Sequence, residues 1–335
     1  MELNARTAVV TLAETFTISR GSEDEATVIQ VEVSHDGQTG YGEAAPLAHY
    51  NESGDSALAW LDRVEVGDDP FALDAIFESL PPGEYAARAA LDHALHDLQG
   101  KLTGLPVYKL LGLKRLGPPT SWTIWLGDPD DMARRTEKIA GRGFKRLKLK
   151  LGGHDGLDAE RVKAVQSVTD LPLQCDVNEG WSLDEALEYL PQMDLQYCEQ
   201  PLKAGDPDGP ELKRRSPVPI FVDEDCHTLA DLPMCAERAH GINIKLAKAG
   251  GIRESVRMAV AARAFGLGVM LGCMVESGLG IAPGAHIASL MDHVDLDGNL
   301  LLAHDPWPGV AFENGVQVPA DRPGLGVERN GVAAA

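Results

Sequence analysis

Lysine residues recur inside apolar segments of this chain, where lone charges are costly. In Arg146–Leu151 the leucines alternate with Lys148 and Lys150, and Lys245 lies within the apolar segment 242–246. Side chains alternate between the two faces of a strand, so Lys148 and Lys150 share one face. A buried lysine needs a negative partner, and we therefore expect these lysines to face carboxylates.

Three carboxylates lie at the ends of the apolar segments between these lysines. They are Asp176, Glu199 and Asp223. Gathered together they would repel each other unless a cation lay among them. Their oxygens are hard ligands, and no His or Cys set has metal spacing, so we predict Mg²⁺ rather than zinc. A single buried Asp is more often a cap or an ion-pair partner, and Lys245 could be a structural ion-pair partner too.

A repeated unit must position these residues. An apolar strand, a short polar loop and an amphipathic helix recur about every 25 residues, the size of a βα unit in a parallel sheet. Eight such strands favour a barrel, with a doubly wound open sheet as the alternative. The predicted strands are Ser121–Leu126, Arg146–Leu151, Leu173–Asn178, Gln196–Gln200, Ile220–Asp225, Ile242–Ala247, Val269–Met274 and His293–Asp297.

In a barrel, Lys150 and Lys245 would belong to the second and sixth strands and lie opposite each other. A substrate carboxylate on the metal would then have one lysine on each face of its α-carbon. This is a layout for removing a proton from one face and returning it on the other. We expect burial and neighbouring positive charge to lower a lysine pKa toward the range of a general base.

The rest of the chain predicts a second domain. Val28–Val33 alternates as a strand, and Glu84–Gly100 has helical spacing. We predict a capping domain over residues 1–116, to which 306–335 returns, and a barrel over 117–305.

Composition excludes several classes of function. Asp and Glu number 51 against 30 Lys and Arg, a formal net charge of −21. Such a surface repels phosphates and anionic lipid, so we expect neither nucleic acid nor membrane partners. The 5 cysteines contain no Cys-x-x-Cys pair, which argues against disulfides or zinc. We see no signal peptide or spanning segment, and a cytoplasmic location is the default expectation.

These residues, in this order, resemble the enolase superfamily, muconate-lactonising subgroup. The resemblance covers nearly the whole chain and implies a TIM-type (β/α)7β barrel with an α+β capping domain, Mg²⁺ on Asp176, Glu199 and Asp223, and catalysis by Lys148, Lys150 and Lys245. Asn178 and Glu224 are implied as a supporting shell. The matching motifs are Lys148-x-Lys150, Asp176-x-Asn178, Glu199-Gln200-Pro201, Asp223-Glu224, and Lys245 followed by Lys248-Ala249-Gly250-Gly251.

Within that subgroup the chain is most similar to dipeptide epimerases of the L-Ala-D/L-Glu epimerase type. Their mark is an Asp-x-Asp at the eighth strand, here Asp295 and Asp297, which binds the α-ammonium of the substrate. Two carboxylates suit a cation, although an Asp-Gly turn without a ligand is the alternative. The resemblance also implies that the loop with Arg20 closes over the site and helps choose the second residue of the dipeptide. We count Thr123 as a further substrate-binding residue.

The resemblance predicts a Mg²⁺-dependent dipeptide epimerase acting on L-Ala-L/D-Glu or a related dipeptide, in a possible homo-oligomer. Asp225 and Glu276 depart from the family pattern and could alter the side-chain preference. The alternatives are an o-succinylbenzoate synthase or a muconate-type cycloisomerase, neither of which needs an ammonium site. A non-catalytic barrel that only binds is the alternative from another class.

Overall fold

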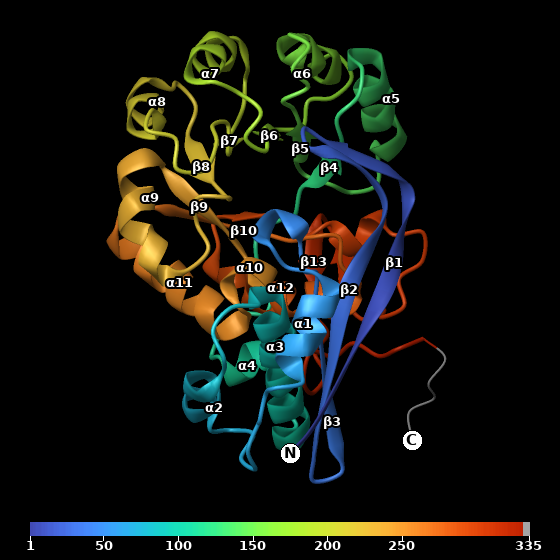
Figure 1. Ribbon diagram of the computed structural model, residues 1–335. Coiled ribbons are helices and arrows are strands. Elements are labelled where there is room, and N and C mark those ends of the chain that lie inside the picture. The colour runs from blue at the N-terminus through green and yellow to red at the C-terminus, as the bar shows by residue number, and fades with distance from the viewer. Residues whose placement is uncertain (331–335) are drawn as a thin grey trace.

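A computed structural model describes residues 1–330 of the chain. Eight parallel strands form one curled sheet in the order β11-β10-β9-β8-β7-β6-β5-β4, which confirms the predicted barrel with its capping domain (Figure 1). Residues 331–335, assigned above to the capping domain, lie outside the described residues. The strands are β4 (Trp122–Ile124), β5 (Leu147–Lys150), β6 (Leu173–Asp176), β7 (Cys198–Glu199), β8 (Ile220–Val222), β9 (Gly241–Lys245), β10 (Gly268–Gly272) and β11 (His293–Val294).

Helices cover the outer face of this sheet, and one of them begins with a capping box. The Ser182 hydroxyl accepts a hydrogen bond from the Glu185 amide, and the Glu185 carboxylate accepts one from the Ser182 amide, at the start of α7. The helices are α5 (Pro129–Ile139), α6 (Asp158–Gln166), α7 (Leu183–Tyr189), α8 (Gly209–Arg215), α9 (Leu232–Arg238), α10 (Leu246–Ala249), α11 (Ile252–Ala264) and α12 (Gly278–Ile287), with 3₁₀ turns η2 (Leu190–Gln192), η3 (Leu229–Asp231), η4 (Ala288–Leu290) and η5 (Gly298–Leu301).

The first and last strands of the sheet meet at a seam made of few contacts. A single bridge pairs Thr120 with Val294, and the Ser121 amide donates to the Val294 carbonyl at 3.1 Å. Next to it the Leu296 amide donates to the Thr120 hydroxyl oxygen at 2.8 Å. Side chains thus contribute to closing the barrel where the backbone ladder is short.

The alternation on β5 places charges inside the barrel. Leu147 and Leu149 are fully buried in the apolar layer beneath the helices, while Lys148 and Lys150 belong to the opposite face. Another layer of the interior contains the aromatic pair Tyr197 and Phe221, whose ring centroids are 4.9 Å apart. The barrel is therefore a packed core with a polar end.

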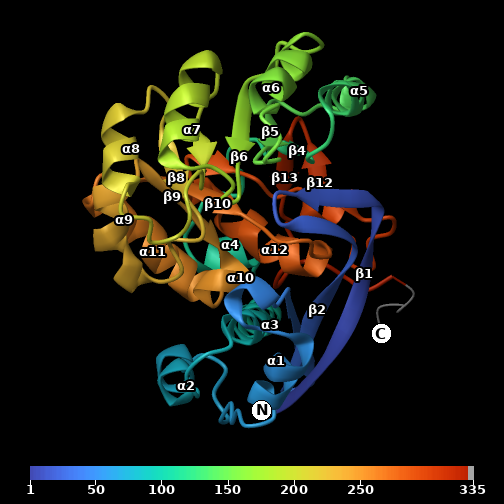
Figure 2. The same ribbon diagram turned by 45° about the horizontal axis from the view of Figure 1, so that its top comes forward.

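The capping domain is an antiparallel sheet packed against a long helix (Figure 2). Gly40 and Gly42 lie so close to the backbone of this helix that a Cβ atom on either would clash with a carbonyl group. Asp36 and Gly37, both at positive φ, make the hairpin turn between the second and third strands of this sheet. The elements are β1 (Glu2–Ile18), β2 (Gly21–His35), β3 (Gln38–Ala44), η1 (Ala48–Tyr50), α1 (Gly54–Leu61), α2 (Leu73–Ser79), α3 (Tyr85–Thr103) and α4 (Val107–Leu110).

The C-terminal segment contacts both domains. It contains a small hairpin, β12 (Ala311–Glu313) and β13 (Val316–Val318). Gln317 donates to the Leu296 carbonyl at 2.7 Å in the barrel, and the Leu325 amide donates to Asp97 on α3 at 2.7 Å.

Two buried glutamates cross-link the domains. Glu43 of β3 accepts a hydrogen bond from the Ser277 amide of the barrel at 2.8 Å, and Glu276 accepts one from the Ala45 amide of the cap. Burial, together with the charge of Glu43, raises the pKa of Glu276 to about 7. These carboxyls hold the cap on the barrel without a lysine or arginine bonded to either.

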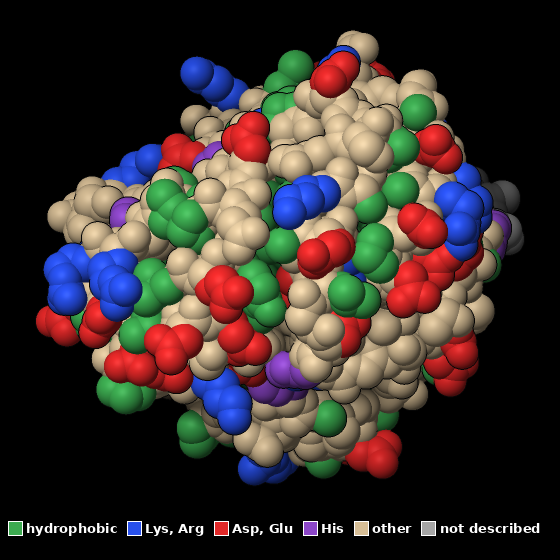
Figure 3. Space-filling view, turned by 90° about the horizontal axis from the view of Figure 1, so that it is seen from above, with side chains coloured by type: hydrophobic (Ala, Val, Ile, Leu, Met, Phe, Trp, Pro, Cys, Tyr) green, Lys and Arg blue, Asp and Glu red, His purple; other side chains and the backbone are tan. Residues whose placement is uncertain are grey.

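Acidic side chains are spread over the face shown in Figure 3, between a smaller number of basic ones. Within residues 1–330, the helices are all too short or too polar to cross a membrane.

Candidate active site

Two lysines of β5 contact carboxylates on the neighbouring strands. The Lys150 Nζ lies 2.6 Å from Asp176 Oδ2. The Lys148 Nζ lies 3.2 Å from the same oxygen and 2.7 Å from Glu199 Oε2. All four side chains are buried, with Lys150 the most exposed at 8%. Consecutive parallel strands therefore bring these predicted residues together at the C-terminal end of the barrel.

The opposite side of the barrel has a matching arrangement. The Lys245 Nζ, at the end of β9, lies 2.8 Å from Asp223 Oδ2. The Lys248 Nζ, in α10, lies 2.5 Å from Asp223 Oδ1 and donates to the Cys226 carbonyl at 2.8 Å. Lys248 was not among the predicted site residues, although it belongs to a motif that carried the resemblance.

The carboxylate arc (Asp176, Glu199 and Asp223) and the lysines shift each other's pKa. Burial alone would raise the pKa of Asp176 and Asp223, but the adjacent lysines outweigh it and hold both values below their usual range. Burial would lower the pKa of Lys245, but Asp223 and Glu199 raise it above its usual value. The expectation of a lowered lysine pKa is wrong for Lys245 in this structure, because carboxylates outnumber lysines in its immediate surroundings.

The arc has the donor atoms that a hard cation needs. Glu199 Oε2 and Asp223 Oδ2 are buried and have no hydrogen-bond partner among the described residues, although each lies in an ion pair. Such oxygens suit Mg²⁺. The residues present therefore fit the predicted metal.

Asn178 and Glu224, which the resemblance implies as a supporting shell, lie beside the arc. The Asn178 amide donates to Asp176 Oδ1 at 3.0 Å, and its side-chain oxygen accepts from Lys150 at 3.2 Å. Its Nδ2 lies 3.4 Å from Glu224 Oε1. Sequence reasoning missed a similar contact, in which Asn243 donates to Glu199 at 2.6 Å.

The aspartate pair (Asp295 and Asp297) follows directly after β11. Asp295 Oδ2 lies 2.8 Å from the Lys148 Nζ, and its Oδ1 has no hydrogen-bond partner among the described residues. Asp297 Oδ2 accepts a hydrogen bond from the Thr123 amide at 2.7 Å. Burial, together with the charge of Asp295, raises the pKa of Asp297 to about 7. Thr123 therefore contacts the pair through its backbone.

The hairpin between β1 and β2 brings Arg20 to the mouth of the barrel. Its Nη1 lies 2.7 Å from Glu224 Oε1 and 3.3 Å from Glu179 Oε2. His49 of η1 also contacts Glu179, at 3.4 Å. Within residues 1–330, His49, Glu179 and Glu224 form a cluster in which one possible metal-ligand atom of each residue lies within 4.8 Å of those of the other two. The Arg20 guanidinium already neutralises part of the negative charge of this cluster. The cluster is therefore better explained as a set of ion pairs between the capping domain and the barrel.

The two acidic departures from the family pattern are both bonded to the protein itself. Asp225 pairs with Arg238 at 3.1 Å and accepts hydrogen bonds from Gln200 and the Gly205 amide. Glu276 faces the capping domain, as described above. Neither carboxylate is free to meet a substrate side chain.

The comparison with protein families agrees with this geometry. Residues 2–112 match the N-terminal domain of mandelate racemase/muconate lactonizing enzyme, and residues 131–333 match the enolase C-terminal domain-like family. The chain therefore belongs to the mandelate racemase/muconate lactonizing enzyme family.

Its relatives include dipeptide epimerases. It is 39% identical to an L-Ala-D/L-Glu epimerase of Bacteroides thetaiotaomicron, over 94% of this chain and 85% of that one. It is also 39% identical to a hydrophobic dipeptide epimerase of Roseobacter litoralis, over 92% and 93% of the two chains. A dipeptide epimerase from Enterococcus faecalis, solved with Mg and L-Leu-L-Tyr, superposes with a TM-score of 0.92 at 30% identity, covering 98% of this chain and 99% of the other.

Proposed function

We propose that this protein is a Mg²⁺-dependent dipeptide epimerase that inverts the α-carbon of the C-terminal residue of a dipeptide. The observation that carries the proposal is the placement of Lys150 and Lys245 on the second and sixth barrel strands, with the carboxylate arc between them. The dipeptide epimerases among its relatives support the same conclusion.

The two lysines have the roles of base and acid. One Nζ removes the α-proton from one face of the substrate, and the other Nζ returns a proton on the opposite face. Which lysine acts first depends on the configuration of the substrate. Lys148, bonded to Asp176 and Glu199, adds positive charge close to the reacting carboxylate.

Asp176, Glu199 and Asp223 would hold the Mg²⁺. When bound, the ion would hold the substrate carboxylate and offset the negative charge that this group gains as the α-proton leaves. With the charge of the arc taken up in this way, Asp223 and Glu199 would raise the pKa of Lys245 less, and the lysine would be a better base.

The aspartate pair favours a dipeptide over the substrates of the rival enzymes. A dipeptide has a free α-ammonium, which requires a negative partner once it leaves water. Among the described residues one lysine, Lys148, contacts this pair, through Asp295. Burial and the charge of Asp295 raise the pKa of Asp297 to about 7, so the negative charge of the pair is only partly compensated and a cation would be favoured there. A cycloisomerase or o-succinylbenzoate synthase substrate has no such group and would leave the pair uncompensated.

Proton exchange in D₂O tests the proposal. A set of dipeptides is incubated with the protein and Mg²⁺, and α-deuteration and inversion of the C-terminal residue are followed by ¹H NMR. We expect both with at least one dipeptide, and loss of both after exhaustive chelation, with recovery when Mg²⁺ is returned. Exchange that survives chelation, or no exchange with any dipeptide, would contradict the proposal.

A further inference from the structure

The mouth of the barrel has one cationic side chain held by two carboxylates. Arg20 Nη1 lies 2.7 Å from Glu224 Oε1 and 3.3 Å from Glu179 Oε2, and it also donates to the Asn178 carbonyl at 3.4 Å. Ser19 donates to the same carbonyl at 2.9 Å. The hairpin tip is thus bound to the loop after β6, and Arg20 is already paired before any substrate side chain arrives.

The backbone fixes Glu179 in this position. Asn178 and Glu179 have φ values of +46° and +68°, a conformation that is unusual for residues other than glycine. Glu179 Oε1 accepts a hydrogen bond from the Ala204 amide at 2.8 Å, which leaves Oε2 facing Arg20 and His49. The Glu179 side chain is only 16% exposed. Because both of its oxygens have partners, the Glu179 carboxylate is a fixed partner of Arg20.

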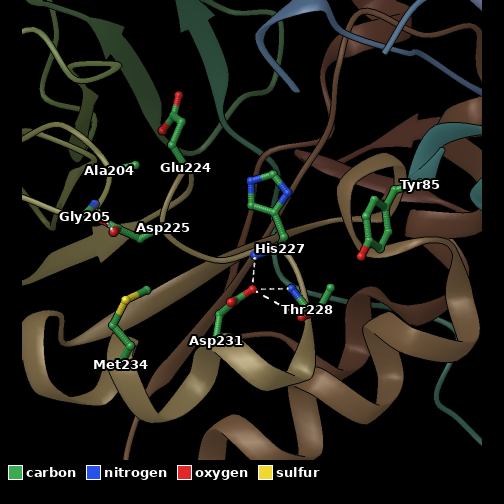
Figure 4. Close-up of a pocket in the computed structure, with 9 residues that line it drawn as sticks. All are labelled: Tyr85, Ala204, Gly205, Glu224, Asp225, His227, Thr228, Asp231 and Met234. Atoms are coloured by element: carbon green, nitrogen blue, oxygen red, sulfur yellow. Dashed lines mark hydrogen bonds between the residues drawn. The ribbon is translucent and has the colours of Figure 1, made fainter. Parts of the chain in front are cut away.

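The hollow beside Glu224 supplies no other cation for an acidic side chain. It has a volume of about 410 Å³, and its lining includes Glu224, Asp225, His227 and Asp231 but no lysine or arginine (Figure 4). Asp231 is used for hydrogen bonds to the amides of His227 and Thr228. Burial and the charge of Arg20 lower the pKa of His49, so that this ring adds little positive charge at neutral pH.

We propose that Glu179 sets the side-chain preference of the dipeptide reaction by occupying Arg20, so that the site favours dipeptides with an uncharged C-terminal residue over those with an acidic one. An acidic side chain that approached Arg20 would meet the carboxylates of Glu179 and Glu224, and like charges at such distances are strongly unfavourable. An uncharged side chain leaves the ion pairs intact. This proposal rests on the proposed function.

The test uses two dipeptides of the same shape, L-Ala-L-Gln and L-Ala-L-Glu. For the unmodified protein with Mg²⁺ we expect kcat/KM to be at least about tenfold higher with L-Ala-L-Gln. In Glu179→Gln, the amide oxygen can still accept from Ala204 but the charge is gone, and the ratio should shift toward L-Ala-L-Glu by about tenfold. Turnover of L-Ala-L-Gln by the variant reports that it has folded.

Two further variants test whether the shift in the ratio comes from the Glu179–Arg20 pair or from a change in the overall charge of the protein. Glu211→Gln removes a carboxylate that pairs with Arg215 at 2.7 Å on α8, away from the mouth, and should leave the ratio unchanged. In Arg20→Gln the second change, Glu179→Gln, should shift the ratio by less than it does alone, because it then removes only the repulsion by Glu179 and releases no arginine; this non-additivity is the sign that the two side chains act as a pair.

The outcomes distinguish this proposal from the proposed function. If dipeptides are epimerised but the unmodified protein prefers L-Ala-L-Glu, or Glu179→Gln leaves the ratio as it was, the role of Glu179 is wrong and the epimerase proposal stands. A shift of equal size in Glu211→Gln would also overturn it. If no dipeptide exchanges its α-proton, both proposals fall.

Discussion

The carboxylate arc and the aspartate pair are two groups of acids inside the same barrel, and they differ in their partners. The arc contacts four lysines: Lys148, Lys150, Lys245 and Lys248. Among the described residues, the aspartate pair contacts one lysine, Lys148, through Asp295. Accordingly the pKa of Asp176 is lowered, while that of Asp297 is raised to about 7.

This difference suits the two groups to different roles in the proposed function. The arc would position the catalytic lysines and the metal, and the aspartate pair would recognise the substrate. The lysines that contact the arc keep Asp176 and Asp223 ionised although both are buried, so that part of the site can form from the chain's own charges. In the aspartate pair the negative charge is only partly compensated, so that Asp297 holds a proton more readily than a free carboxyl does and an added cation would be favoured. In the proposed dipeptide epimerase that cation would be the substrate's α-ammonium.

Replacing a lysine that contacts the arc should lower the activity more than any other change. We expect Lys150→Ala and Lys245→Ala each to lower the rate of epimerisation by at least about 10³-fold, because one of the two proton transfers loses its acid or base. Each variant should still exchange the α-proton of one epimer in D₂O, since the opposite lysine remains. Activity within tenfold of the unmodified protein in both variants would rule out the two-base mechanism.

Removing charge from the aspartate pair should have the next largest effect. N-acetylation of the dipeptide removes the ammonium, and Asp297→Asn removes its partner. Either change should lower kcat/KM by roughly a hundredfold, or about 3 kcal/mol, the scale of a lost charge-assisted contact. Steady-state kinetics on free and acetylated substrate measure this, and equal rates on the two would sink the dipeptide assignment.

The raised pKa of Asp297 makes the same contact sensitive to pH. Below about pH 7 the Asp297 carboxyl is protonated and cannot pair with an ammonium. We expect kcat/KM for a dipeptide to fall as the pH drops below 7, and to recover above it. In Asp297→Asn the fall of kcat/KM at acidic pH should be weaker. If the variant has the same pH profile as the unmodified protein, another group is responsible for the fall.

Glu276 is a third kind of buried acid, because among the described residues it has no lysine partner and it faces the capping domain. Its titration should have the smallest of the predicted effects, on stability and not on activity. Its folded pKa is about 7, above its usual value, so the folded protein keeps a proton that the unfolded chain releases. The free energy of unfolding should therefore fall as the pH rises from 5 to 8, by roughly 2–3 kcal/mol from this group.

Glu276→Gln cannot ionise, and its urea unfolding curves at pH 5 and pH 8 should differ less than those of the unmodified protein. Glu211→Gln, on the surface of α8, is the control and should show the unmodified pH dependence. If the free energy of unfolding of Glu276→Gln changed between pH 5 and pH 8 by as much as that of the unmodified protein, Glu276 would not be the group responsible.

The sequence contains enough local information to predict the barrel and most of the site. The alternation around Lys148 and Lys150 and the repeat of βα units predict which strands exist and which side chains point inward. Consecutive parallel strands then bring Asp176, Glu199 and Asp223 to one end, whatever the loops do. These features depend on short-range periodicity, which a single sequence displays.

The contacts between cap and barrel could not be predicted in this way. Arg20 meets Glu179 across 159 residues of sequence, and no periodicity relates them. The left-handed backbone at Asn178 and Glu179 that directs this contact is equally invisible, because neither residue is a glycine. The sequence leaves open that Asp225 alters the side-chain preference, because it does not show that Arg238 on α9 pairs with this carboxylate.

The seam of the barrel sets the order in which the two acid groups can form during synthesis. The Thr123 amide and Asp297 are separated by 174 residues, and the contact between them needs both the first and the last strand. The lysines and carboxylates of the arc all belong to residues 148–248, which leave the ribosome earlier. A nascent chain stopped before residue 293 would hold every residue of the arc but no aspartate pair. Under the proposed function, the part of the site that would bind the ammonium group is therefore the last to be completed as the chain is made.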